Sequence, residues 1–386
     1  QSLGRVLAAP VVARMSVPSY DQAAMDGFAV RAAEVAEACD MRPVVLPVVG
    51  SVAAGDPAPP LPPGRAIRIA TGAALPAGAD LVVPFEWTDA GSPVRIMRSA
   101  RAGAHLRRAG EDVVAGEVAL MAGSAIGPAR IGLLTSIGVN TVACRRRPRL
   151  AVLSTGAELS TEPAAGPVAP PRVPDSNTAT LLAAGRAAGC EVQAFGPVID
   201  DVESFRDRLS AAAATADLIV TTGGISAGDH DVVKAALSNT GDSGSSGEQG
   251  GFWFGSVALK PGRPQGCGVL HREDGRRVPV VTLPGTPIAA AASFALFLVP
   301  AIRALVGQRW RPQQAVLATA VEGSARTVLL PAVRIDGGRV APLHGHAGHS
   351  QRLLAAADAL LVVPPTGKVV PAGTTLEILP MHLEEI

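Results

Sequence analysis

Aromatic side chains are scarce in this sequence, where phenylalanine, tryptophan and tyrosine together make up 3% of 386 residues. Charged residues are also few, at 17%, and their signs nearly balance to a formal charge of +1. A chain without a strong global field is not built to attract nucleic acid or an anionic membrane, so any attraction for anions must be local. Because 48% of the residues are hydrophobic, the chain can still bury a sizeable core, filled mainly by alanine and valine.

Cysteine is rare and widely spaced. The four cysteines show no CxxC spacing: Cys39, Cys144, Cys190 and Cys267. We therefore expect neither a disulfide framework nor a zinc site, but reduced and packed thiols in a cytosolic protein.

Signals for export or membrane insertion are weak as well. The first residues lack the charged and then apolar pattern of a signal peptide. One long stretch without a charged residue is 282–302, and its apolar part is too short to span a bilayer comfortably. We expect the part of this stretch that follows the turn at Gly285 to form a buried helix.

The length predicts two to four domains, since one domain usually has about 100–200 residues. The 42 glycines and 33 prolines indicate many turns and much β-structure outside an α/β region. We expect an elongated chain with a central three-layer α/β domain on a mostly parallel sheet, a β-rich inserted domain and an all-β C-terminal domain. The expected boundaries are 1–28 with 117–148 for an N-terminal linker domain, 29–116 for the β-rich domain, 149–307 for the α/β domain and 308–386 for a barrel-like domain.

Three apolar runs in the α/β region each end in a glycine-bearing turn without a charged side chain. They are LAVLSTG at 150–156, DLIVTTGG at 217–224 and VPVVTLPG at 278–285. Such runs predict parallel strands that are buried on both faces. Ligands of an open parallel sheet bind beyond the carboxyl ends of its strands, where these turns would lie. Small residues there let backbone N–H groups approach an anion, so the sequence predicts a phosphate-tolerant pocket.

Helical periodicity is found at four places. The expected helices span 128–137, 177–190, 204–217 and 231–237. Asn177 or Thr178 is placed to cap the second helix, and Asp231 lies near the start of the fourth. Residues 241–251 are a flexible insertion with no residue positioned for chemistry. The arginine-rich stretch 145–150 permits a nucleic-acid interpretation, but a solvated linker is favoured.

Eight segments of the chain occur together in the order of one known family. They are VPSYDQAAMDGFAV, IRIATGAALPAGADLVVPFE, LRRAGEDVVAGE, LAVLSTGAEL, PDSNTATLLAAGRAAGCEVQAFGPVIDD, TTGGISAGDHDVV, VALKPGRP and TLPGTP. By these segments the chain resembles the MoeA/gephyrin E-domain family, the molybdopterin molybdenumtransferases of molybdenum cofactor biosynthesis. The resemblance covers essentially the whole chain.

The resemblance implies a MogA-like central domain and an Mg²⁺-dependent cytoplasmic enzyme that inserts molybdate into adenylylated molybdopterin and releases AMP. It implies a homodimer, held through the N-terminal linker domain, in which the β-rich domain of one subunit completes the pocket of the other. A MogA-like adenylyltransferase would be the upstream donor, and neither nucleic acid nor a membrane is an expected partner.

The resemblance also implies roles for individual residues. The implied catalytic residues are Asp26, Thr71, Glu158, Asp200, Asp231 and Lys260. Glu158, Asp200 and Asp231 would also be the metal ligands, because carboxylates around one crevice repel each other unless a cation such as Mg²⁺ joins them. The implied substrate-binding residues are Ser154, Thr155, Gly156, Gly223, Gly224, Ser226, Pro261, Gly262, Arg263, Pro284, Gly285 and Pro287.

Four of these residues also have a plain structural interpretation. Asp26 fits a turn before Gly27, and Thr71 fits a β-turn. Glu158 fits the start of a helix, although an unpaired charge after a buried strand would be expensive to bury. Lys260 fits an ordinary surface lysine, but its apolar flank and rigid turn favour a point charge against phosphate or molybdate.

Two further groups leave both interpretations open. Arg107 and Arg108 match a family segment, while a surface salt bridge with Glu111 or Asp112 explains them equally well. The histidines of HGHAGH, 344–349, permit a metal site, but no acidic partner is adjacent and a loop is favoured.

Several positions depart from the family pattern. The departures are Ala23, Ala157, Ser256, Thr286 and Pro331. The changes at Ser256 and Pro331 replace cations that the family uses against molybdate. Either Arg334, Arg352 or the histidines compensate, or the chain is a paralogue, acting as a molybdopterin-binding scaffold or as a nucleotide-phosphate hydrolase. His349 and Ser350 would replace a Gly-Ser turn that the family often has here to hold the oxyanion.

Overall fold

The computed structural model describes residues 2–160, 172–225, 231–238, 251–308, 310–343 and 350–381. The backbone forms two compact units, Gln1–Arg145 and Arg146–Ile386. The finer division into four domains stays a prediction.

The first unit contains a β-rich part with a four-stranded sheet. Its strands, in spatial order, are β5 (Val48–Val52), β6 (Ala66–Ile69), β3 (Gly27–Val30) and β7 (Leu81–Pro84). Gly27 is required where β3 passes β7, because a Cβ atom there would lie 2.1 Å from the carbonyl oxygen of Val83. Gly27 also pairs with Ile69, so the residue before β3 and the residues after β6 share one edge of the sheet.

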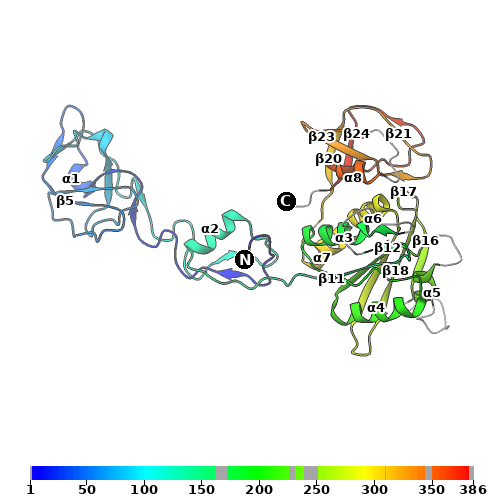
Figure 1. Cartoon of the computed structure of the whole chain (residues 1–386). Helices are drawn as coiled ribbons and strands as arrows, with labels where there is room; N and C mark the ends of the chain where they lie inside the picture. The colour runs from blue at the N-terminus through cyan, green and yellow to red at the C-terminus, as the bar shows by residue number, and fades with distance from the viewer. Residues whose placement is uncertain are drawn as a thin grey trace. The chain divides into compact units, whose positions relative to one another are not determined.

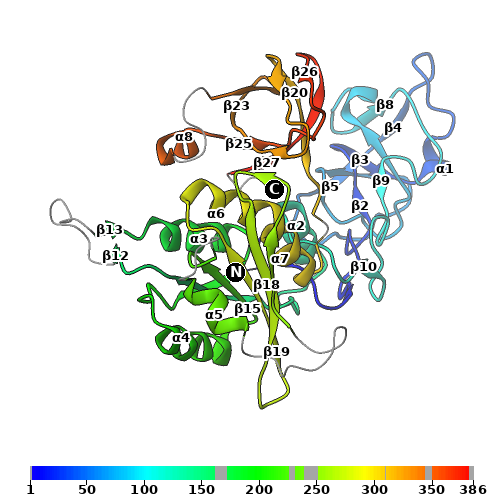
Figure 2. The same ribbon diagram turned by 90° about the vertical axis from the view of Figure 1, so that its right-hand side faces the viewer.

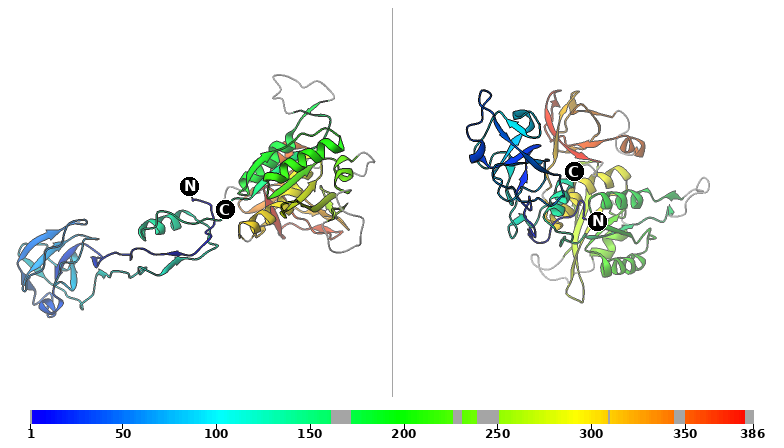
Figure 3. Two further views of the ribbon diagram at one scale, coloured as in Figure 1. Left: turned by 90° about the horizontal axis from the view of Figure 1, so that it is seen from below. Right: turned by 90° about the vertical axis from the view of Figure 1, so that its left-hand side faces the viewer.

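Shorter elements complete the first unit. They are β1 (Val11–Val12), β2 (Gln22–Ala23), α1 (Ala32–Val35), β4 (Val44–Leu46), β8 (Val94–Ile96), β9 (Leu106–Arg107), β10 (Val118–Leu120) and α2 (Pro128–Ser136). Helix α2 begins at Pro128 as the sequence predicts, and Leu134 packs with Leu7 and Val11 in a separate small core. Within this unit, α2 lies apart from the β-rich part, to which two long chain segments connect it (Figures 1 and 3).

The second unit is built on a six-stranded sheet with the strand order β14–β11–β15–β19–β18–β16. The three predicted strands are its neighbouring parallel strands β11 (Arg149–Ser154), β15 (Leu218–Thr222) and β19 (Arg277–Leu283). The remaining strands are β14 (Glu191–Ala194), β18 (Pro264–His271) and β16 (Trp253–Ser256). Only the pairings of β18 with β19 and β16 are antiparallel in the described sheet, so the mostly parallel arrangement is confirmed.

Helices cover both faces of this sheet and make the three layers that Figures 1 and 2 show. One face carries α4 (Val202–Thr215) and α5 (Val232–Ser238), and the other carries α3 (Ser176–Ala187), α6 (Pro287–Ser293) and α7 (Val299–Leu305). Phe205 and Val233 pack with Ile219 on the first face, and Leu181 and Phe294 are buried on the second. The predicted three-layer α/β domain is thereby confirmed.

The expectation that the apolar stretch at 282–302 is too short for a bilayer is wrong. Helices α6 and α7 join through the π-helical turn Phe294–Leu298 into one segment, Pro287–Leu305. Its 19 residues are long and apolar enough to cross a membrane by length and composition alone, but 56% of an apolar 18-residue window in it is buried inside the protein, in line with the expected buried helix. Phe294, Leu298 and Ile302 pack against the sheet, as in the core helix of a soluble domain.

The C-terminal part of the second unit is a closed barrel, drawn in orange and red in Figure 2. Its strands are β20 (Gln313–Leu317), β24 (Arg339–Pro342), β23 (Ala332–Asp336), β25 (Ala359–Leu361) and β27 (Thr375–Pro380). Strand β17 (Leu259–Lys260) pairs with β22 (Val328–Leu329), which ties the α/β part to the segment that enters the barrel.

Two further expectations need correction. The arginine-rich stretch is not simply solvated, because Arg146 and Arg149 both pair with the carboxylate of Asp217. The cysteines are free, but only Cys190 is buried; Cys39 and Cys267 are exposed. Burial raises the pKa of the Cys190 thiol to about 12.

Candidate active site

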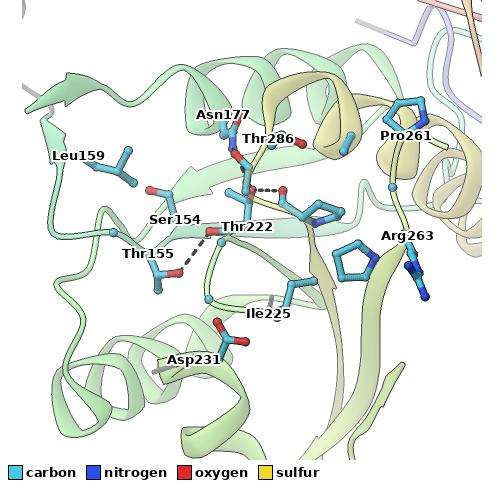
Figure 4. Close-up of a pocket in the computed structure, with 18 of the residues that line it drawn as sticks. Ser154, Thr155, Leu159, Asn177, Thr222, Ile225, Asp231, Pro261, Arg263 and Thr286 are labelled. Atoms are coloured by element: carbon cyan, nitrogen blue, oxygen red, sulfur yellow. Dashed lines mark hydrogen bonds between the residues drawn. The ribbon is translucent and has the colours of Figure 1, made fainter. Parts of the chain in front are cut away.

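The carboxyl ends of β11, β15 and β19 open into a pocket of about 720 Å³. This volume lies within the range of small-molecule sites, roughly 300–1,000 Å³. Ser154 and Thr155 lie at the end of β11 and Thr222 at the end of β15, while Asp231 stands at the start of α5 (Figure 4). The pocket is therefore at the edge of the sheet where the sequence predicts a ligand.

Most of the predicted site residues line this pocket. They are Ser154, Thr155, Gly156, Glu158, Asp200, Gly223, Gly224, Asp231, Lys260, Pro261, Gly262, Arg263, Pro284 and Gly285. Pro287 is not in the lining and occupies the first turn of α6. Ser226 and the histidines at 344–349 lie outside the described residues.

The glycine turns pack too closely for any larger residue. Gly223 has φ +91° and Gly224 has φ +64°, a left-handed backbone that side chains disfavour. A Cβ atom on Gly223 would lie 2.6 Å from the carbonyl oxygen of Thr155, and one on Gly285 would lie 3.3 Å from the Cα atom of Gly223. The ends of β11, β15 and β19 thus lie backbone to backbone, and the N–H groups of Thr155, Gly156 and Gly223 donate to carbonyl oxygens of Thr222, Val198 and Leu283.

Asn177, which the sequence suggests only as a helix cap, connects two of these turns. Nδ2 of Asn177 donates to Oγ1 of Thr222 at 3.0 Å and to the carbonyl oxygen of Gly285 at 2.7 Å. Oγ1 of Thr222 donates in turn to the carbonyl oxygen of Pro284 at 2.9 Å. Asn177 therefore fixes the end of β15 against the turn that follows β19.

The cap of α3 is Asp175, so the expectation of Asn177 or Thr178 is wrong. Oδ1 of Asp175 accepts from the backbone N–H of Thr178 at 3.1 Å. Its Oδ2 accepts from the hydroxyl of Ser154 at 2.5 Å, and that hydroxyl also accepts from Oγ1 of Thr178 at 3.1 Å. The buried hydroxyl of Ser154 thus already donates one hydrogen bond and accepts another within the protein.

The acidic side of the pocket holds Glu158, Asp200 and Asp231. Glu158 is exposed, so the cost of burying its charge does not arise. Oδ2 of Asp200 accepts from the backbone N–H of Ala157 at 3.1 Å, which keeps this carboxylate beside the turn after β11. Oδ2 of Asp231 lies 3.2 Å from the ammonium of Lys234.

The three carboxylates suit Mg²⁺ by their chemistry, since this ion prefers oxygen ligands and often keeps bonds to water and substrate phosphate. Among the described residues, no three His, Cys, Asp or Glu side chains gather closely enough to hold an ion by themselves. By chemistry the three carboxylates suit Mg²⁺, but as they stand an ion would need further ligands from a bound phosphate and water.

The basic side of the pocket is the turn after β17. Lys260 and Arg263 are both exposed, and neither side chain makes an ion pair within the described part of the chain. The turn itself is held from below by Gln265, whose Nε2 donates to the carbonyl oxygen of Gly262 at 2.8 Å and to Oγ of Ser293 at 2.6 Å. The side chains of Gln265 and Ser293 are both buried, so the turn that carries Lys260 and Arg263 is held in a fixed position.

Asp26 and Thr71 belong to the first unit, where the structure brings them together. Oδ1 of Asp26 accepts from the backbone N–H of Thr71 at 2.7 Å and from its hydroxyl at 2.8 Å. These bonds, with a smaller contribution from Arg68, lower the pKa of Asp26 below its ordinary value. This pair is more than a plain turn, because a single carboxylate oxygen accepts both the backbone and the side-chain hydrogen bond of Thr71.

The remaining candidates have structural partners. Nη1 of Arg108 lies 2.5 Å from Oδ2 of Asp21, and its backbone N–H donates to Glu111. Ser350 caps α8 (Gln351–Ala355) by accepting from the backbone N–H of Leu353 at 3.2 Å.

Comparison with known proteins gives a consistent result for both units. The family model described as MoeA N-terminal region (domain I and II) matches residues 1–138, and the one described as probable molybdopterin binding domain matches residues 151–304. Molybdopterin molybdenumtransferase 2 of Mycobacterium tuberculosis is 40% identical over 385 residues, which cover 98% of this chain and 93% of the relative. Molybdopterin molybdenumtransferase 1 of the same organism is 35% identical, with 98% and 92% covered.

Solved structures agree with this result. Two crystal structures of a molybdopterin biosynthesis MoeA protein from Pyrococcus horikoshii are 28% and 25% identical to the chain, with TM-scores of 0.79 and 0.80. They cover 99% and 98% of this chain, and 92% of each solved chain is covered. The chain therefore belongs to the MoeA family of molybdopterin molybdenumtransferases.

Proposed function

We propose that the protein inserts molybdate into adenylylated molybdopterin and releases AMP, which yields the molybdenum cofactor. Support comes from the pocket itself, where three glycine turns at the ends of parallel strands lie between a side with three carboxylates and a side with Lys260 and Arg263. Such a combination suits a phosphoanhydride, which needs donors for its oxygens and a balance for its negative charge.

The residues of the pocket have distinct roles in this proposal. Backbone N–H groups of the turns at Gly224 and Gly285 cradle the phosphates. Lys260 offsets the charge that develops on phosphate as the phosphoanhydride bond breaks and AMP leaves, and Arg263 assists it. Asn177 keeps the two turns in register.

Glu158, Asp200 and Asp231 would hold Mg²⁺ together with substrate oxygens. When bound, the ion would neutralise phosphate charge and polarise the phosphoanhydride. Without the cation, these three carboxylates would repel a phosphate, because the charges are of the same sign.

Asp26 and Thr71 would act in the pocket of a second subunit, in a cytoplasmic homodimer held through the N-terminal linker domain. Support comes from the fixed geometry of the pair, since a carboxylate ordered by two hydrogen bonds is suited to a ligand that arrives from outside its own sheet. A MogA-like adenylyltransferase would supply the adenylylated substrate.

The departures at Ser256 and Pro331 favour one alternative, a paralogue that binds molybdopterin with altered or absent turnover. Ser256 is the last residue of β16, and Pro331 immediately precedes β23. Neither serine nor proline carries a positive charge that could bind molybdate. The other cations considered for this role, Arg334 and Arg352, lie in β23 and α8 of the C-terminal part.

Measurement of AMP release from adenylylated molybdopterin, with and without molybdate, tests the proposal. A molybdenumtransferase gives AMP release that depends on molybdate and matches the amount of cofactor formed. Release without metal insertion would indicate a hydrolase, and binding without release would indicate a scaffold. Either of these outcomes would contradict the proposed transfer.

A further inference from the structure

Asp175 is a half-buried carboxylate next to the candidate active site, although it is not among the described residues that line the pocket. It stands immediately before α3 and uses both of its oxygens. Oδ1 accepts from the backbone N–H of Thr178 at 3.1 Å, and Oδ2 accepts from the hydroxyl of Ser154 at 2.5 Å. The second bond has the short length of a hydrogen bond to a charged acceptor, which makes it one of the stronger kind.

Capping of α3 does not by itself require a carboxylate at this position. Asparagine and serine cap helices about as well as aspartate, because one side-chain oxygen is enough to accept from the first turn. The second oxygen of Asp175 is therefore available for Ser154, and a buried charged group without such a partner would be costly. The hydroxyl of Thr178 also donates to Oγ of Ser154, at 3.1 Å. The start of α3 thus holds the Ser154 side chain through two residues.

Ser154 is the last residue of β11, and the turn that follows it carries the acidic side of the pocket. A Cβ atom on Gly196 would lie 2.7 Å from the backbone nitrogen of Ser154, so the segment after β14 passes Ser154 closely. That segment continues to Asp200, whose carboxylate accepts from the backbone N–H of Ala157. A shift of Ser154 would therefore displace the turn that carries Glu158 and its contact with Asp200.

The start of α3 also contacts the other two turns. Asn177 lies in the same helical turn as Thr178, and Figure 4 shows it at the end of β15. Its Nδ2 donates to Oγ1 of Thr222 and to the carbonyl oxygen of Gly285, and this fixes the orientation of the amide because a carbonyl can only accept. One short stretch, 175–178, therefore binds to the ends of β11 and β15 and to the turn after β19.

We infer that Asp175 is a positioning residue of the candidate active site. Through Ser154 it holds the start of α3 against β11, and so it keeps the three turns in the arrangement that binds the nucleotide phosphate. The inference rests on the proposed function for the identity of this ligand. It gives Ser154 a role as the partner of Asp175 in place of direct contact with the substrate, because the Ser154 hydroxyl is buried and already bonded.

Asp175→Asn is the variant that separates positioning from capping. Asparagine keeps the helix cap but presents an amide N–H group where the Ser154 hydroxyl needs an acceptor. Calorimetric titration of the full-length protein with AMP in the presence of Mg²⁺ measures the effect without turnover. We expect AMP binding to weaken about tenfold, as loss of a supporting residue around a metal site commonly does. A merely structural role would lower the free energy of unfolding and leave the affinity for AMP unchanged.

Asp201→Asn is the matched control. Asp201 caps α4 by accepting from the backbone N–H of Ser204 at 2.8 Å, and it is not among the described residues that line the pocket. The same chemical change is thus made at a second helix cap of the same α/β region. We expect this variant to bind AMP as the wild-type protein does.

Ser154→Ala tests whether Asp175 acts through Ser154. If it does, the double variant Asp175→Asn/Ser154→Ala binds AMP no more weakly than the weaker of the two single variants, since both changes remove the same interaction. Direct and independent contact of Ser154 with the nucleotide would instead make the two losses multiply.

Three results would overturn the inference: wild-type protein that does not bind AMP, Asp175→Asn that binds it with wild-type affinity, or losses that multiply in the double variant. If Asp175→Asn does not fold, which circular dichroism would reveal, Thr178→Val takes its place, because it removes the second hydrogen bond to Ser154. Unchanged affinity in that variant would overturn the inference as well. Failure of the proposed function is recognised separately, as wild-type protein that binds AMP but gives no molybdate-dependent AMP release.

Discussion

Lys260 is the single side chain on which the charge balance of the pocket depends most. It is exposed at the pocket, and Arg263 is the other cation among the described lining residues. Lys260→Ala is expected to lower kcat/KM for molybdate-dependent AMP release roughly 100-fold, the effect of removing one donor from a charge that develops during reaction. Lys368→Ala, at an exposed lysine of the C-terminal part, should leave kcat/KM unchanged. Full activity of Lys260→Ala would contradict the assigned role.

Asp217 is the residue that fixes the start of the second unit. Burial raises the pKa of Asp217, but the hydrogen bonds and ion pairs from Arg146 and Arg149 lower it further, to well below the ordinary value. Because the folded pKa is depressed, the stabilisation is complete above the unfolded carboxyl pKa of about 3.9 and is lost as pH falls below it.

Asp217→Asn is therefore expected to lower the free energy of unfolding by on the order of 2 kcal/mol at neutral pH, the contribution of hydrogen bonds to a charged group. In urea unfolding, the difference from wild type should shrink as pH falls below about 4. Asp207→Asn, at an exposed carboxylate on α4, is the control and should be neutral. A difference that stays constant down to low pH would argue against the ion pairs as its source.

At the scale of elements, Gln265 on β18 supports the turn that carries Lys260. Gln265→Leu removes both hydrogen bonds, to Gly262 and Ser293, while it keeps a side chain of similar size. We expect kcat to fall about tenfold with little change in KM, because misplacement of Lys260 affects the reacting state more than binding. Gln193→Leu on the exposed edge of β14 serves as the control. A variant that melts earlier but keeps its kcat would show that Gln265 is only structural.

The main strands were predictable because burial on both faces leaves a direct mark in sequence. The runs at 150–156, 217–224 and 278–285 match β11, β15 and β19 to within one residue at their starts, whereas the order of these strands in the sheet was not predicted. The length of the buried helix Pro287–Leu305 was misjudged, since proline is tolerated in the first turns of α6 and α7. The cap of α3 was missed because Asp175 stands next to two other capping residue types.

The candidate site was predictable only in part. Glycine turns and charged residues next to strand ends can be recognised in the sequence. Asn177 and Thr222 are 45 positions apart, and their hydrogen bond forms only in the folded protein. Gln265 and Ser293 are joined in the same way. Nothing in the sequence of the alternating strand around Arg68 indicates that its side chain is fixed. Only the contact of its guanidinium with the ring of Phe85 in the folded protein shows this.

At the scale of the whole molecule, the proposed homodimer makes a prediction about mixtures of variants. Asp26→Asn and Glu158→Gln should each be strongly impaired alone, because each removes a carboxylate from every site. A heterodimer of the two contains one site with both natural carboxylates if Asp26 acts in the pocket of the partner copy. Mixing should therefore restore part of the molybdate-dependent AMP release, up to about half of the wild-type rate. No recovery in heterodimers verified by differential tags would contradict action across subunits.

The central claim is that the turns after β11, β15 and β19 form the nucleotide-phosphate site. A crystal structure of the protein soaked with AMP and Mg²⁺ tests it most directly. The account predicts the phosphate of AMP against the backbone N–H groups of Gly224 and Gly285, with Lys260 on one side and Glu158 on the other. AMP bound elsewhere, with these turns empty at saturating nucleotide, would contradict it.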